Sequence, residues 1–71
     1  MNITCSGLYP PDNGFMDCSE GISPSLPAHF GVWCSFRCAR GFTLLGSTYR
    51  TCTVDGNWTG AETTCIGEYM L

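Results

Sequence analysis

The sequence contains six cysteines within 71 residues: Cys5, Cys18, Cys34, Cys38, Cys52 and Cys65. An even number of cysteines in so short a chain is typical of a complete disulfide framework. Disulfides persist in oxidising compartments, so we expect an extracellular protein, either secreted or the ectodomain of a cell-surface protein. A chain of this length buries only about 60% of its unfolded surface, and its core alone is marginal. We therefore expect one domain in which disulfides replace core volume.

The charge of the chain limits its partners. Charged residues make up 13% of the sequence, and three Lys or Arg residues against six carboxylates give a net charge of −3. Nucleic acids and anionic membranes require clustered positive charge, so we expect neither as a partner. No apolar run is long enough to cross a bilayer, so we expect no direct membrane insertion. The expected partners are extracellular proteins or neighbouring domains of the same chain, and we expect the isolated module to be monomeric.

Hydrophobic alternation predicts three short strands. Residues 32–38 alternate with a period of two, as in a half-buried strand. Its inward-facing residues are Val32, Cys34, Phe36 and Cys38, and its outward-facing residues are Trp33, Ser35 and Arg37. Further strands are predicted over 41–45 and 48–53, and residues 20–27 read as an exposed loop. Signals for helices are almost absent. The fold class is therefore a small all-β domain with short antiparallel strands and long connections.

Geometry excludes some of the cysteine pairings. Cys34 and Cys38 on one strand would place their Cα atoms about 13 Å apart. The Cα atoms of bridged cysteines are rarely more than about 6.8 Å apart. Every connectivity that joins these two cysteines is therefore excluded, and the others remain open.

The neighbourhoods of the cysteines form a recognisable pattern. Its parts are Asn13-Gly14 after Pro11, the segment 36–46 (FRCARGFTLLG), the segment 52–58 (CTVDGNW) and finally Cys65. From Cys5 to Cys65 the chain resembles a complement control protein module, also called a sushi domain or short consensus repeat. Two further segments, 14–18 and 34–38, resemble the six-cysteine consensus repeats of selectins, a subtype that also occurs in matrix and cell-surface proteins.

The resemblance implies both a pairing and a core. The implied disulfides are Cys5–Cys52, Cys38–Cys65 and Cys18–Cys34. The first two would close opposite ends of an elongated module. In this family Gly41 would provide a tight backbone position, and Trp58 would pack over the Cys5–Cys52 bridge as the largest core element. The side chains implied around Trp58 are those of Phe36, Phe42 and Leu44. One departure is Thr63, which stands where the family usually has proline, and we expect it to loosen the final turn.

The same resemblance suggests how the chain is divided. Residues 5–65 would form the sushi domain. Residues 1–4 would be an N-terminal extension or linker, and residues 66–71 a C-terminal linker or tail.

No active site or metal centre is predicted. Structural zinc sites are usually built from two close cysteine pairs or a Cys/His cluster, whereas most cysteines here are widely spaced and His29 is alone. The carboxylates show no paired spacing for acid–base chemistry. We expect no catalytic residue, no metal and no cofactor. Asn2-Ile3-Thr4 and Asn57-Trp58-Thr59 match the N-glycosylation motif, so Asn2 and Asn57 are candidate glycosylation sites.

Two surfaces are candidates for binding a protein. Trp33 and Arg37 point outward from one predicted strand and are residue types that dominate interface hot spots. The alternative for Trp33 is packing on the loop or on a neighbouring strand. Ile22 and Leu26 lie on the proline-rich loop, where the alternative is that they are tucked under Pro24 and Pro27.

These features predict a non-enzymatic extracellular module that mediates protein–protein interaction or cell adhesion, or that acts as a spacer in a larger cell-surface or matrix protein. One alternative is a recognition module for a complement component or a cytokine. Another is a small disulfide-rich protease inhibitor, for which only the loop over residues 20–30 qualifies. That loop contains no Arg or Lys to suit a trypsin-like pocket.

Overall fold

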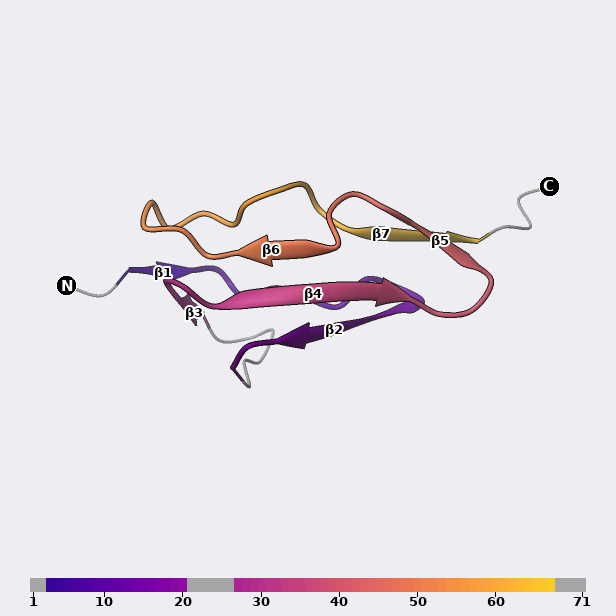
Figure 1. Ribbon diagram of the computed structural model, residues 1–71, viewed down its shortest axis with the longest axis horizontal. Helices are drawn as coiled ribbons and strands as arrows, with labels where there is room; N and C mark the ends of the chain where they lie inside the picture. Colours follow the sequence, from indigo (N-terminus) through magenta and orange to yellow (C-terminus); the bar gives the residue numbers. More distant parts are fainter. Residues whose placement is uncertain (1–2, 21–26, 68–71) are drawn as a thin grey trace.

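The computed structural model describes residues 3–20 and 27–67, and all regular secondary structure within these ranges is β-strand. The strands are β1 (Thr4–Cys5), β2 (Gly14–Cys18), β3 (Ala28–His29), β4 (Trp33–Cys38), β5 (Phe42–Leu45), β6 (Tyr49–Thr51) and β7 (Thr64–Gly67). The molecule is elongated, with extents of 50 × 19 × 16 Å (Figure 1). The expected small all-β fold is confirmed.

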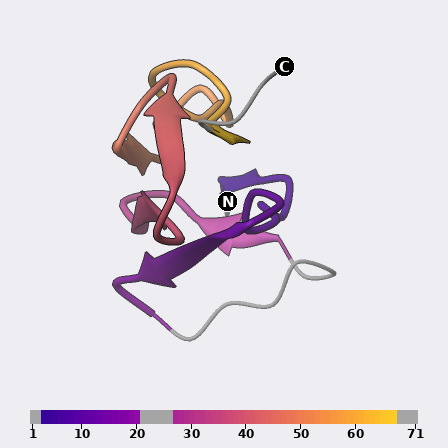
Figure 2. The same ribbon diagram turned by 90° about the vertical axis from the view of Figure 1, so that its right-hand side faces the viewer.

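The strands form three small antiparallel sheets arranged along the long axis. The central sheet has the order β2-β4-β6, and β4 is its middle strand. The β1-β3 pair lies at one end of the molecule and the β5-β7 pair at the other (Figure 1). Figure 2 views the molecule along its long axis from the β5-β7 end. Since β1 and β7 lie at opposite ends, the chain crosses the full length of the module between them.

The three strands predicted from alternation are present, with shorter bounds. β4 begins at Trp33 rather than Val32, β5 begins after Gly41, and β6 covers only Tyr49–Thr51 of the predicted 48–53. β2 and the shorter β1, β3 and β7 are not predicted from the sequence, because a few residues without strong alternation become strands only through pairing with a partner. The predicted loop over 20–27 lies largely outside the described residues.

The chain has three disulfides, of which two join different sheets or segments and one lies within the central sheet. Cys5–Cys52 joins β1 to the segment after β6, with a Cα–Cα distance of 5.8 Å. Cys38–Cys65 joins the end of β4 to β7 at 5.6 Å. Cys18–Cys34 links β2 and β4 at a position where the two cysteines are direct cross-strand neighbours. These are the pairs that the family resemblance implies.

Disulfide-bonded cysteines make up much of the core. Among the described residues, the buried apolar ones are Cys5, Ala28, Val32, Cys34, Phe36, Cys52 and Cys65. Most of them are disulfide-bonded cysteines, and the largest fully buried side chains are Cys5, Cys34 and Cys52. Disulfides therefore occupy the volume that large aliphatic side chains fill in bigger domains.

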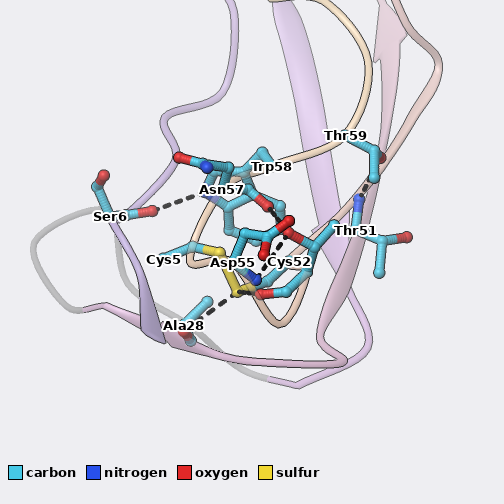
Figure 3. Close-up of a disulfide and its surroundings, with 10 residues drawn as sticks. Cys5, Ser6, Ala28, Thr51, Cys52, Asp55, Asn57, Trp58 and Thr59 are labelled. Carbon is cyan, nitrogen blue, oxygen red and sulfur yellow. Dashed lines mark hydrogen bonds between the residues drawn. A yellow bond between two sulfur atoms is a disulfide. The ribbon is translucent and has the colours of Figure 1, made fainter. Parts of the chain in front are cut away.

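Trp58 is half-buried rather than the largest element of a single core. It lies beside the Cys5–Cys52 bridge and forms a β-bridge with Cys52, and its indole Nε1 donates a hydrogen bond to the Ser6 carbonyl at 2.8 Å (Figure 3). Phe36 lines the same hollow as Trp58.

The other two side chains expected around Trp58 lie elsewhere. Phe42 and Leu44 belong to β5 at the opposite end, where Leu44 pairs with Cys65. The expected cluster is therefore divided in two, because a molecule so long and narrow cannot gather its large side chains at one point.

Strand pairing continues past the first and last cysteines. Thr4 in β1 pairs with His29, and Ile66 and Gly67 in β7 pair with Thr43 and Phe42. Ile66 and Gly67, expected to begin a linker, are thus part of a sheet. The structure does not describe residues 1–2 or 68–71.

Thr63 ties the final turn to a neighbouring segment instead of loosening it. The side chain is buried, and its hydroxyl donates a hydrogen bond to the backbone carbonyl of Ser47. The expectation drawn from the missing proline is therefore wrong, since a proline at this position lacks such a donor.

Replacing Thr63 with valine is expected to lower the free energy of unfolding by about 1 kcal/mol, because valine keeps the shape but removes the donor. Urea denaturation followed by tryptophan fluorescence measures the change. Thr64→Val is the matched control: Thr64 is the exposed first residue of β7, and we expect its replacement to be nearly neutral. Equal stability of Thr63→Val and the native protein would show that this hydrogen bond contributes nothing.

Candidate functional site

One face of the central sheet carries several large exposed side chains. Directly paired residues share a face of a sheet, and the pairs on this face are Phe15 with Arg37, Asp17 with Ser35, and Ser35 with Tyr49. Trp33 joins them because it lies two residues from Ser35 on β4. We call the surface formed by Phe15, Asp17, Trp33, Ser35, Arg37 and Tyr49 the aromatic face. The intervening residues Cys34 and Phe36 are buried on the other side.

Arg37 is held at one end of the aromatic face by two neighbours. Its guanidinium carbon lies 4.6 Å from the centre of the Phe15 ring, within the range of a cation–π interaction. Its Nε lies 3.7 Å from Oδ2 of Asp17, and the side chains of this ion pair are 66% and 70% exposed. An ion pair so exposed adds little stability. The contacts orient the guanidinium while leaving it accessible to solvent.

Trp33 and Tyr49 form a second aromatic contact at the other end. Their ring centres are 5.0 Å apart with an angle of 15° between the planes, which is a stacked arrangement. Trp33 remains 37% exposed and Tyr49 53% exposed. The backbone N–H of Trp33 donates to the Ser19 hydroxyl at 3.1 Å. The ring of Trp33 is therefore packed on a residue of the neighbouring strand β6, which is one of the expected arrangements, and part of its surface remains exposed.

The structure brings together some of the predicted binding residues. Trp33 and Arg37 lie on the aromatic face, whereas Ile22 and Leu26 lie outside the described residues. Phe15 and Tyr49 are not among the residues predicted from the sequence. The polar Asp17 two residues after Phe15 is the available signal for an outward-facing Phe15, but only the register of β2 against β4 places it beside Arg37.

The candidate glycosylation site at Asn57 lies in the turn beside the Cys5–Cys52 bridge (Figure 3). Asn57 is exposed, and its backbone carbonyl accepts hydrogen bonds from the N–H and the hydroxyl of Thr53. Its sequence neighbour Trp58 is half-buried. Glycosylation at Asn57 stays a prediction, and Asn2 lies outside the described residues.

A hollow of about 720 Å³ lies on the side of the sheet where Phe36 points. Its lining includes Tyr9, Arg50 and Trp58, and it contains no histidine and no free cysteine among the described residues. Within the described ranges, no group of three or more His, Cys, Asp or Glu residues is placed to hold a metal ion. The same part of the chain has no helix that could span a membrane.

The all-β fold, the three bridges and the cysteine spacing define a class of small disulfide-stapled module. The profile of the Sushi repeat (SCR repeat) family matches residues 5–65. The chain belongs to the sushi repeat family.

The relatives of this chain are large proteins. It is 40% identical over 71 residues to P-selectin of Mus musculus and 36% identical over 63 residues to E-selectin of Bos taurus. It is also 38% identical over 63 residues to the sushi, von Willebrand factor type A, EGF and pentraxin domain-containing protein 1 of Rattus norvegicus. These alignments cover 97%, 89% and 89% of the chain, but only 9%, 13% and 2% of the relatives. The chain therefore corresponds to a small part of each relative.

Proposed function

We propose that the chain is a non-enzymatic interaction module of a larger extracellular protein, and that its aromatic face binds a protein partner. Membership of the sushi family and the similarity to selectins support a role in adhesion or protein interaction. Three disulfides support an oxidising, extracellular location.

The observation that carries this proposal is the composition of the aromatic face. Three exposed aromatic rings and an exposed arginine lie on one side of a single small sheet. Tryptophan, tyrosine and arginine are enriched among the few residues that supply most of the binding energy in protein interfaces. Trp33 and Arg37 also adjoin Cys34 and Cys38, which anchor β4 through two different disulfides. This anchoring reduces the conformational entropy that the face loses on binding.

The charges of the aromatic face indicate the chemistry of the partner. Asp17 and Arg37 form an ion pair, so the face carries no net charge. A partner would therefore offer an apolar patch for the rings, with an acceptor for Arg37 at its edge. Such a mixed surface is typical of protein interfaces.

The elongated shape supports a second role as a spacer. The chain enters at the β1 end and leaves at the β7 end of a molecule 50 Å long. We propose that residues 5–65 form the module and that the flanking residues connect it to neighbouring domains of the same protein.

Binding of the module to a panel of complement components, cytokines and cell-surface ectodomains tests the proposed face. For any partner found, Trp33→Ala is expected to weaken affinity about 30-fold, the loss typical of a hot-spot residue. Arg37→Ala and Tyr49→Ala are expected to weaken it less but clearly. Surface plasmon resonance measures the dissociation constants, and denaturation curves confirm that each variant is folded.

Tyr9→Ala is the matched control for Tyr49→Ala. Tyr9 is 70% exposed, but it lines the hollow on the opposite side of the sheet. If Tyr9→Ala weakens binding while the three variants of the aromatic face leave affinity unchanged, the hollow and not the aromatic face is the binding surface.

A further inference from the structure

The three disulfides create short covalent connections between the two ends of the module. A force that pulls the ends apart is transmitted along the shortest covalent path from Cys5 to Cys65. That path passes through a disulfide wherever the disulfide bypasses a stretch of backbone. The connectivity therefore sets how far the module can lengthen, even after its strands have separated.

In the intact module the shortest path uses Cys5–Cys52 and then the backbone from Cys52 to Cys65. About 13 peptide units of roughly 3.6 Å each, together with the 5.8 Å bridge, reach about 53 Å. The reach of the unfolded module between Cys5 and Cys65 is therefore limited to about 53 Å, and Cys5–Cys52 lies on the path that becomes taut first.

Opening Cys5–Cys52 transfers the load to a different path. This path follows the backbone from Cys5 to Cys18, crosses to Cys34, continues to Cys38 and crosses to Cys65. About 17 peptide units and the two bridges, of 3.9 and 5.6 Å, reach roughly 71 Å. The module would lengthen by only about 18 Å.

Opening Cys5–Cys52 in a module that lacks Cys18–Cys34 would lengthen the module much more. The load would then follow the whole backbone from Cys5 to Cys38 before crossing to Cys65. About 33 peptide units and one bridge of 5.6 Å reach roughly 124 Å, a gain of about 70 Å.

We propose that Cys18–Cys34 acts as a backup restraint, which limits the length of the module under tension when Cys5–Cys52 is opened by a thiol. In the opening step a thiolate attacks one sulfur of Cys5–Cys52 and forms a mixed disulfide, and the other cysteine leaves as a thiolate. Cys5 and Cys52 are each only 1% exposed in the folded module, so the attack follows unfolding by the force. This role is independent of the aromatic face and of any partner.

Single-molecule force-clamp measurements with dithiothreitol, a small dithiol, test the proposal. Handles are fused to the two chain ends, and the contour length is followed at constant force. In the native protein we expect the part of the contour between Cys5 and Cys65 to stay within about 53 Å without the dithiol, and a first reduction step of about 18 Å with it. In the Cys18→Ser/Cys34→Ser variant, we expect the first reduction step to be about 70 Å.

Non-reducing peptide mapping establishes the disulfides of both proteins before they are pulled. A first reduction step of the same size in the two proteins would overturn the proposal. If the variant does not fold with its remaining bridges intact, the native protein alone still tests the proposal. A native first step near 70 Å would show that Cys18–Cys34 does not restrain the chain.

Discussion

Replacing both Cys5 and Cys52 with alanine is expected to lower the free energy of unfolding by about 4 kcal/mol. The bridge closes a loop with a sequence separation of 47, so its loss returns much conformational freedom to the unfolded chain. Both cysteines are also fully buried at the end of the molecule where Trp58 packs. Small domains are stable by only about 5 kcal/mol at the low end of the usual range. The variant would then keep only about 1 kcal/mol of stability, so we expect a measurable fraction of it to be unfolded at physiological temperature.

Urea denaturation followed by tryptophan fluorescence measures this loss, and Cys18→Ala/Cys34→Ala is the control. The Cys18–Cys34 loop has a sequence separation of only 16, so its removal is expected to cost about 1 kcal/mol less than removal of Cys5–Cys52. A larger loss for the Cys18–Cys34 variant would contradict this account, in which the size of the closed loop dominates the contribution of each bridge.

Replacing Gly46 with alanine is expected to lower the free energy of unfolding by about 3 kcal/mol. Gly46 has a φ of 96°, which side-chain-bearing residues rarely adopt. An added Cβ would also overlap the backbone carbonyl of Glu62, which cannot rotate away as a side chain would. This contact lies where the segment after β5 passes the segment before β7, next to the hydrogen bond from Ser47 N–H to the Ala61 carbonyl.

Gly41→Ala separates the two causes of this loss. Gly41 has a similar φ of 88°, but a Cβ there would meet nothing within 4 Å. We expect its replacement to cost about 1–2 kcal/mol from backbone strain alone. Denaturation curves of the two variants give the comparison. Equal losses would mean that the close approach to Glu62 has no effect on stability.

The part of the aromatic face that lies on one strand could be predicted from the sequence. Alternation along residues 32–38 places Trp33 and Arg37 on the same side, and β4 has this arrangement. The contribution of Phe15 could not be predicted in this way, because it depends on the register of β2 against β4. The stacking of Tyr49 on Trp33 likewise depends on how β6 pairs with β4.

The division of the core into two parts likewise could not be predicted from the sequence. A single cluster of Phe36, Phe42 and Leu44 around Trp58 is compatible with the sequence pattern, since all four are large apolar residues. The structure places Phe42 and Leu44 on β5 at the other end, because β5 pairs with β7 there and not with the central sheet.

Local features of the chain thus determined its class: the cysteine count, the alternation along β4 and the near absence of helix signals are enough for a small, disulfide-stapled all-β module. The tertiary structure decided the register of the sheets, the membership of the aromatic face and the separation of the core into two ends. Hydrophobic alternation is a pattern among residues close together in the chain, so it is visible in the sequence. Strand pairing joins residues far apart in the chain, so its register is defined only in the folded structure.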